Sequence, residues 1–256
     1  MKLQGKVALI TGADSGIGQA IAAAFAQEGA DVSITWHTDE QGAQETKRQV
    51  EAVGRRATVV QCDVAEAGSV QAAFDRTVAS FGTPDLLVAN AGTGMGGMPV
   101  AEMDDAKLME VLGTDLVGPL FCARAFVRLR KAAGGGGRLI VIGSVAGHLP
   151  TPGSAPYGMA KAGVNSLIRS LSVEVAPDRI NVNAIAPGLI ATPMTQKVLD
   201  DPAKREKSMA AIPWHRPGRA EEIAGLAVFL ASDAADYVTG QTWVMDGGLT
   251  MHWGGA

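Results

Sequence analysis

The chain has 256 residues, of which 47% are apolar, and its formal net charge is -4. This composition is too apolar for a disordered chain, and it lacks the strong positive charge of a nucleic-acid-binding surface. A chain of this length can build one sizeable core, so we expect a single domain over residues 1–256 and no nucleic acid among its partners.

The first apolar run, KVALITGA, is too short to span a membrane and lacks the layout of a secretory signal. We therefore expect a cytoplasmic protein that does not enter the membrane. Cys62 and Cys122 stand far apart in apolar surroundings, which favours two reduced, buried thiols over a disulfide. The histidines show no spacing typical of metal ligands, and we predict no metal site.

Short apolar runs alternate with helical stretches along the chain. The runs begin at residues 7, 32, 57, 85, 138, 180 and 242. Most are continuous rather than alternating, as strands buried on both faces of a parallel sheet require. The segments between them carry apolar residues at helical spacing. This order predicts an α/β fold, a single-domain Rossmann fold with a doubly wound parallel sheet of about seven strands and helices on both faces.

Two segments interrupt this order. Residues 134–137 are four glycines, which we interpret as a flexible turn rather than a linker because a strand follows at once. Residues 188–219 are rich in Pro, Met and charge and show no clear periodicity. Loops of this length in compact domains usually form lids or binding loops, so we expect a substrate lid here.

The stretch TGADSGIG lies between the first strand and the first helix. Its glycines, Gly12, Gly16 and Gly18, permit a tight turn that brings backbone N–H groups and the positive helix end against a pyrophosphate. Their spacing differs from the usual G-x-G-x-x-G pattern, and a simple turn would need no ligand. The position between strand and helix favours a dinucleotide site.

The same stretch resembles the T-G-x-x-x-G-x-G signature of the short-chain dehydrogenase/reductase family. NAG at 90–92, YGMAK at 157–161 and APG at 186–188 stand in the family's order, so the resemblance covers nearly the whole chain. It implies an NAD(P)-dependent oxidoreductase that acts on a secondary alcohol or ketone. The residues it implies for cofactor binding are Gly12, Asp14, Ser15, Gly16, Ile17, Gly18, His37, Thr38, Asp63, Val64, Asn90, Gly92, Tyr157, Lys161, Pro187, Gly188, Ile190 and Thr192.

The end of the second strand bears on the choice of cofactor, since an acid there would bond the ribose 2′-OH of NAD. Trp36 occupies that position. Thr38 and Gln41 predict a capping box, which makes Asp39 a first-turn helix residue. Without an acid, His37 and Thr38 can donate to a 2′-phosphate, so we favour NADP(H). NAD(H) stays open because no Arg or Lys stands ready.

Three residues predict the reaction chemistry. Tyr157 and Lys161 are four apart in a helical pattern and share one face, and Ser144 ends a strand at the edge where α/β sheets place ligands. An ammonium about 4 Å from a phenol, at an effective dielectric of about 20, is worth roughly 4 kcal/mol, enough to lower a pKa of about 10 by about 3. The resemblance implies that Tyr157 is the acid/base, that Lys161 also holds the nicotinamide ribose, and that Ser144 polarises the substrate oxygen.

Asp115 departs from the family, which usually has Asn at this position of a catalytic tetrad. A carboxylate accepts hydrogen bonds but cannot donate them as an amide does. Three interpretations stay open: a protonated acid, an ion pair with Lys161, or a role for the backbone carbonyl alone.

The substrate walls are expected from residues 92–98, residues 146–150 and the lid, where fixed charges are few. A looser resemblance points to glucose or sugar-alcohol dehydrogenases. The alternative is a 3-oxoacyl carrier-protein reductase, which would need a basic patch such as Arg128, Arg130 and Lys131 for its acidic partner. A cofactor-sensing regulator without catalysis is a further alternative, although the intact catalytic residues argue against it.

The family resemblance also implies a homotetramer. The helix after residue 155 presents the small residues Ala162, Ser166 and Ser170 opposite its core positions, where a second helix could approach closely. We expect the tail, residues 251–256, to reach a neighbouring subunit.

Overall fold

Parallel strands form one central sheet in the order β3–β2–β1–β4–β5–β6–β9. The computed structural model describes residues 1–94, 98–150 and 152–251. The strands of this sheet are β1 (Val7–Ile10), β2 (Asp31–Trp36), β3 (Ala57–Gln61), β4 (Leu86–Ala89), β5 (Gly137–Ile142), β6 (Ile180–Pro187) and β9 (Thr242–Met245). Every neighbouring pair in it is parallel, which confirms the predicted fold class.

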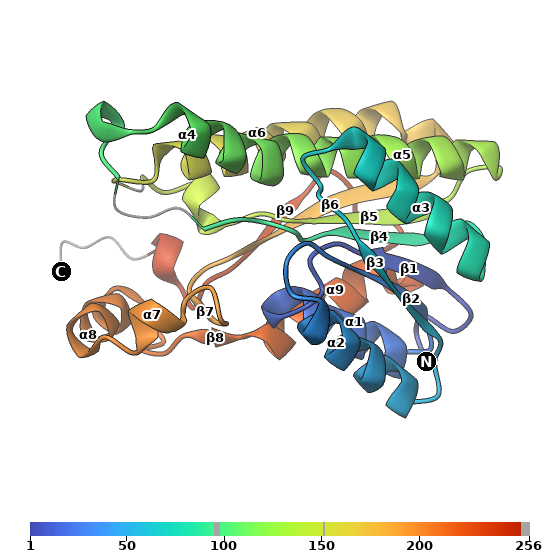
Figure 1. Ribbon diagram of the computed structural model, residues 1–256, viewed down its shortest axis with the longest axis horizontal. Coiled ribbons are helices and arrows are strands. Elements are labelled where there is room, and N and C mark those ends of the chain that lie inside the picture. Colours follow the sequence, from blue (N-terminus) through green and yellow to red (C-terminus); the bar gives the residue numbers. More distant parts are fainter. Residues whose placement is uncertain (95–97, 151, 252–256) are drawn as a thin grey trace.

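Helices cover both faces of the sheet (Figure 1). One face carries α1 (Gly16–Gln27), α2 (Glu40–Ala52) and α9 (Ala220–Ala231). The other carries α3 (Ala67–Phe81), α4 (Asp105–Leu112), α5 (Gly118–Ala132) and α6 (Ala155–Glu174). The result is the three-layer arrangement that continuous apolar strands require, because both faces of each strand must be shielded from water.

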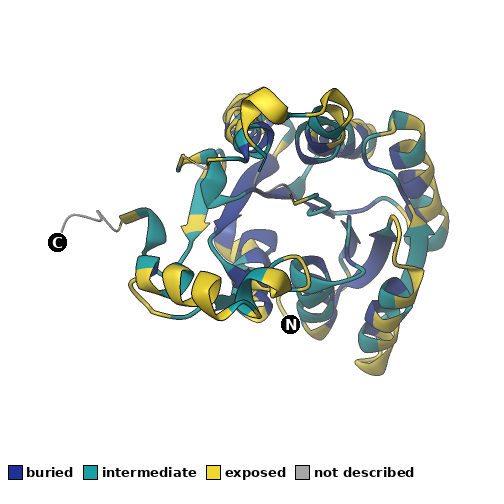
Figure 2. Ribbon diagram, turned by 60° about the vertical axis from the view of Figure 1, so that its left-hand side comes forward, coloured by how far each residue is buried: buried dark blue, intermediate teal, exposed yellow. Residues whose placement is uncertain are grey.

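The strands divide their side chains between two apolar cores, one under each helix layer. Ala8 and Ile10 belong to the core shared with α1 and α9, whereas Leu9 between them belongs to the core shared with α3, α5 and α6. This alternation follows from the two-residue period of a strand. Phe25 and Phe126 are fully buried, one in each core. Figure 2 shows the buried residues concentrated on the strands and the inner helix faces.

The segment from residue 188 to residue 219 is more regular than expected. It holds the helices α7 (Gln196–Leu199) and α8 (Pro202–Ala211) and the short strands β7 (Ile190–Ala191) and β8 (Gly218–Arg219), which pair with each other. Our expectation of a loop without periodicity was wrong here. Asp201 caps α8 by accepting hydrogen bonds from the N–H groups of Ala203 and Lys204, and Pro202 fits the first helical position.

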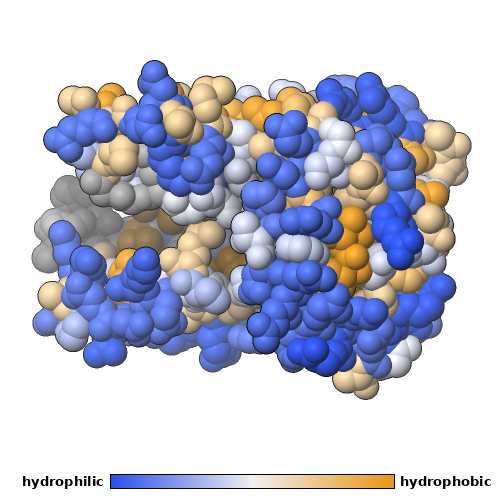
Figure 3. Space-filling view, viewed as in Figure 1, coloured by the Kyte–Doolittle hydropathy of each residue, from blue (hydrophilic) through white to orange (hydrophobic). Residues whose placement is uncertain are grey.

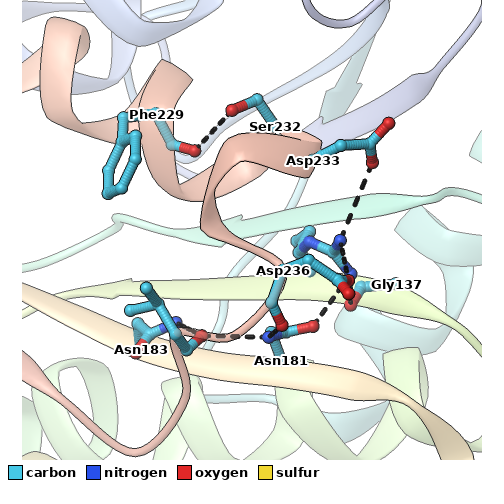
Figure 4. Close-up of polar contacts among 9 residues, drawn as sticks. Gly137, Asn181, Asn183, Phe229, Ser232, Asp233 and Asp236 are labelled. Atoms are coloured by element: carbon cyan, nitrogen blue, oxygen red, sulfur yellow. Dashed lines mark hydrogen bonds and ion pairs between the residues drawn. The ribbon is translucent and has the colours of Figure 1, made fainter.

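Polar side chains hold together the amino edge of the sheet (Figure 4). The Asn181 amide donates to the carbonyls of Asp236 and Val238, and the Asn183 amide also donates to Val238. Arg138 donates to the side chains of Asn181 and Asp236, at 2.8 and 2.9 Å. These contacts attach the connection before β9 to β5 and β6. The predicted glycine turn, residues 134–137, lies at this edge with positive φ angles, and its last residue, Gly137, is already the first residue of β5.

Cys62 and Cys122 are buried and not bonded to each other, as predicted. Burial raises the pKa of both thiols, which keeps them protonated at neutral pH. Within the described residues, no helix combines the length and the apolarity needed to cross a bilayer.

Candidate active site

A cavity of about 770 Å³ opens at the carboxyl edge of the sheet, where the strand order reverses between β1 and β4. Ligands of doubly wound sheets bind at such switch points. Figure 3 shows the corresponding hollow between the α4 side and the α7–α8 side of the molecule. The predicted site residues that line the cavity are Gly12, Asp14, Ser15, Gly16, Ile17, His37, Thr38, Asp63, Val64, Asn90, Gly92, Asp115, Ser144, Tyr157, Lys161, Pro187, Gly188, Ile190 and Thr192.

The glycine turn is shaped partly by contacts within the protein. Gly12 and Gly16 have φ angles of +59° and +55°, a region that other residues rarely adopt. The Asn90 amide donates to the carbonyls of Thr11 and Gly12, at 2.9 and 2.8 Å. Gly18 does not line the cavity. It packs so closely against Asn90 that a Cβ at this position would lie 2.5 Å from the Asn90 amide nitrogen. Gly18 therefore supports the turn by close packing.

The N-terminus of α1 faces the cavity without a side-chain cap. Ser15 holds the N-cap position, yet its side chain makes no capping hydrogen bond. Gly16 and Ile17, the first helical residues, line the cavity. Their N–H groups and the positive end of the helix dipole suit an anionic group such as a pyrophosphate.

The residues after β2 and β3 meet at one end of the cavity. His37 and Asp63 line it, and His37 Nε2 lies 3.7 Å from Asp63 Oδ2. The N-cap of α2 is Asp39, whose carboxylate accepts from the Gly42 N–H at 2.9 Å, so our assignment of the cap to Thr38 was wrong. Thr38 lines the cavity instead.

Tyr157 and Lys161 stand one turn apart on α6, as the spacing predicted, and both line the cavity. The Lys161 ammonium lies 5.3 Å from the centroid of the Tyr157 ring and donates to the Ile142 carbonyl at 3.2 Å. Only 4% of the Lys161 side chain is exposed. A positive charge is thus fixed beside a half-buried phenol.

Asp115 forms an ion pair with Lys161, with 3.0 Å between Oδ1 and Nζ, and this geometry favours the second of our three interpretations. Its other oxygen accepts from the Thr93 N–H at 3.0 Å. Asp115 reaches Lys161 from a π-helical turn, Gly113–Val117, that interrupts the run from α4 into α5. Burial opposes the charge of Lys161, but attraction by Tyr157 and Asp115 outweighs it and raises the pKa of the ammonium.

Ser144 follows β5 and lines the cavity at the carboxyl end of that strand. Its hydroxyl oxygen accepts from the Ala146 N–H at 3.1 Å. A hydroxyl carries one hydrogen and two lone pairs, so this contact leaves its hydrogen available for donation into the cavity.

The far wall of the cavity agrees only in part with the sequence. Met194 and Thr195, from the predicted lid, line the cavity, whereas residues 146–150 of the predicted wall do not. Residues 95–97 of the predicted wall and residues 252–256 of the predicted tail lie outside the described residues. Glu110 and Thr114 also line the cavity, and sequence analysis missed both. Glu110 is the residue one helical turn before Thr114, and Lys107 pairs with it at 2.6 Å.

The cavity fits a nicotinamide dinucleotide by the chemistry of its walls. Uncapped helix N–H groups stand at the glycine turn, polar side chains stand after β2 and β3, and a Ser, a Tyr and a Lys stand together at the carboxyl edge. Glycine-lined space and N–H donors suit a diphosphate. Hydroxyl and ammonium groups suit a reacting oxygen.

Comparison with known proteins agrees with this geometry. A family model described as enoyl-(acyl carrier protein) reductase matches residues 12–250. The chain is 41% identical to a cis-4-hydroxycyclohexanecarboxylate dehydrogenase of Sinomonas cyclohexanicum, over 96% of each chain. It is 39% identical to the 3-oxoacyl-[acyl-carrier-protein] reductase FabG of Escherichia coli, over 98% of this chain and 100% of the relative.

Among solved structures, acetoin dehydrogenase from Enterobacter cloacae is 39% identical, with a TM-score of 0.87 over 98% of this chain and 96% of that one. These relatives match the chain from end to end, so the likeness extends well beyond the cofactor motifs. The chain belongs to the short-chain dehydrogenase/reductase family and is an NAD(P)-dependent oxidoreductase of the alcohol dehydrogenase/reductase kind.

Proposed function

We propose that the protein interconverts a small, neutral secondary alcohol and its ketone, with sugars and polyols among its substrates. The observation that supports this is the convergence of Ser144, Tyr157 and Lys161 on one cavity with the glycine turn. The cavity contains no unpaired Arg or Lys among its described residues, because Lys161 is paired with Asp115. An anionic substrate would find no free partner there.

In this proposal the dinucleotide, when bound, gives or takes the hydride. Tyr157 donates its phenolic proton to the substrate oxygen in ketone reduction and removes it in alcohol oxidation. Ser144 donates a hydrogen bond to the same oxygen as negative charge develops on it. Lys161, 5.3 Å from the ring, stabilises the charge that forms on Tyr157 when it loses its proton.

The cofactor would be held along the cavity by the predicted contacts. Gly12, Ser15, Gly16 and Ile17 would hold the diphosphate, with Gly18 behind the turn, and Asp14 would lie beside the adenosine ribose. Asp63 and Val64 would contact the adenine. Asn90, Gly92 and Lys161 would lie near the nicotinamide ribose, and Pro187, Gly188, Ile190 and Thr192 near the nicotinamide. The sequence favoured NADP(H), because His37 and Thr38 can donate to a 2′-phosphate. In the structure the Asp63 carboxylate lies 3.7 Å from His37 and would compete with that phosphate.

The alternative, a 3-oxoacyl carrier-protein reductase, requires a basic surface for an acidic partner. Arg130 donates to the carbonyls of Gly135 and Gly136 and pairs with Asp85, so it is not available to a partner. Lys131 pairs with Asp178 at 2.9 Å. Both residues lie at the C-terminal end of α5, beside the amino edge of the sheet and away from the cavity. Arg128, the third residue of the predicted patch, is exposed on the same helix. With Arg130 and Lys131 engaged, this arrangement disfavours carrier-protein docking at the predicted patch.

Assembly as a homotetramer also stays a prediction, as do a single functional domain and a cytoplasmic location. Ala162, Ser166 and Ser170 are exposed on α6, which supports the close approach of a second helix there.

The test is a substrate panel with each cofactor, followed at the absorbance band of the reduced nicotinamide. The panel contains sugars, polyols, acetoin, cyclic secondary alcohols and acetoacetyl thioesters. Preferred turnover of a small neutral alcohol supports the proposal. Preferred turnover of the acyl thioester supports the reductase, and cofactor binding without any turnover supports a regulator.

A further inference from the structure

Carboxylates gather at the end of the cavity that follows β2 and β3. Asp14 and Asp63 line the cavity there, next to His37. Asp39 does not line the cavity, but its carboxylate lies beside the Asp14 backbone, since Gly42 packs against both the Asp14 carbonyl oxygen and the Asp39 carboxylate. The glycine turn and the end of β3 therefore each bring one acid to the cavity, and the N-cap of α2 places another beside the first.

These acids are close enough to influence each other. Asp14 is partly buried, and burial raises its pKa. A hydrogen bond to its own backbone and the nearby His37 lower the pKa of Asp14, and the negative charge of Asp39 raises it. The net effect is a raised pKa. A ligand group that approaches Asp14 therefore meets the field of Asp39 as well.

Positive charge is scarce at this end. Among the described residues that line the cavity, Lys161 is the only Lys or Arg, and it is committed to Asp115. His37 is the nearest group that can become cationic, and Asp63 already faces it at 3.7 Å. A bound anion would have to compete with Asp63 for His37.

We propose that Asp14 and Asp39 make this protein select NAD(H) and reject NADP(H). In Rossmann folds the ribose 2′ position lies near the end of the second strand. A 2′-hydroxyl can donate to a carboxylate, whereas a 2′-phosphate brings about two negative charges and would be repelled. Position 36 holds Trp in this chain, so the selecting acids come from the glycine turn and the α2 cap instead.

This inference reverses the preference for NADP(H) expected from the sequence. That expectation counted Asp39 only as a helix residue and gave Asp14 no role in selection. The inference rests on the proposed position of the dinucleotide in this cavity.

The test measures the Kd of NADH and of NADPH for the full-length protein by nicotinamide fluorescence, without substrate. The wild type should bind NADH about tenfold more tightly than NADPH, or better. In the double variant Asp14→Asn/Asp39→Asn, the ratio of the two Kd values should shift by about tenfold in favour of NADPH. Asn is as good an N-cap as Asp, so the variant keeps the start of α2.

Asp75→Asn is the control, because it removes one carboxylate from an exposed site on α3, outside the cavity. It should leave the ratio of the two Kd values unchanged. Tighter or equal binding of NADPH by the wild type would overturn the inference, as would an unchanged ratio in the double variant. Binding of neither dinucleotide would overturn the proposed cofactor site as well.

Discussion

The two edges of the central sheet both bury charged side chains, but those side chains face different surroundings. At the amino edge, Arg138 and Asn181 bond to neighbouring side chains and carbonyls. At the carboxyl edge, Ser144 and Tyr157 line a cavity, with Lys161 paired behind them. The first edge uses polar groups to fix the fold, and the second holds them ready for a ligand. Substitutions at the two edges should therefore have different effects.

The largest effect on activity should come from Tyr157→Phe at the carboxyl edge. It removes the proposed proton donor and keeps the ring, so kcat should fall by about 10³-fold. The Kd of the dinucleotide should stay within twofold, because the ring and Lys161 remain. Initial rates and fluorescence titration measure the two quantities. Retained turnover would contradict the role of Tyr157.

Asn181→Ala at the amino edge should lower the stability of the fold and leave kcat unchanged. It leaves the Asp236 carbonyl without this donor, leaves the Val238 carbonyl with Asn183 alone, and removes an acceptor from Arg138. We expect a loss of about 1–3 kcal/mol in the free energy of unfolding, measured in urea, since part-buried polar groups lose a partner. The kcat of the folded protein should be unchanged. A large loss of kcat with unchanged stability would mean that the two edges are not independent.

Asp115→Asn sharpens the comparison by removing charge from the carboxyl edge without changing its shape. The carboxylate offsets the Lys161 ammonium at 3.0 Å. Without it, the positive potential at Tyr157 rises, so proton removal becomes easier. The pH–rate profile of alcohol oxidation should therefore move to lower pH. An unmoved profile would show that the charge of Asp115 has no part in catalysis.

The same ion pair should make stability depend on alkaline pH. The pKa of Lys161 is raised above its usual 10.5 in the folded protein, so the stabilisation is complete below that pH and is lost as the pH rises through the raised pKa. Urea unfolding between pH 9 and 12 measures this decline. Asp115→Asn should show a shallower decline above about pH 10.5 than the wild type. Parallel declines would contradict the pairing.

The smallest effect is expected from Lys131→Gln, at an ion pair on the surface. The Lys131 side chain is 54% exposed, and its pair with Asp178 is open to solvent and salt. The free energy of unfolding should change by less than about 0.5 kcal/mol. Turnover with acetoacetyl thioester should also be unchanged, whereas a marked loss with that substrate alone would restore the predicted docking patch.

The sequence was sufficient wherever a signal is local. Continuous apolar runs located the strands of the central sheet to within about two residues, because burial on both faces of a strand leaves an unmistakable composition. The spacing of Tyr157 and Lys161 fixed their common face, since a helix repeats about every 3.6 residues. Asp201 and Pro202 also form a local signal, because an N-cap residue followed by Pro marks the start of a helix, here α8.

Only the tertiary structure decided which distant residues meet. The pairing of Asp115 with Lys161 depends on a π-helical turn that no residue pattern specified. The position of Asp39 beside Asp14 depends on how α2 packs against the glycine turn, and the engagement of Arg130 by its neighbours depends on the end of α5. Identity and spacing set local conformation, but the charge that a group meets is set by contacts across long sequence separations, which become fixed only when the layers pack.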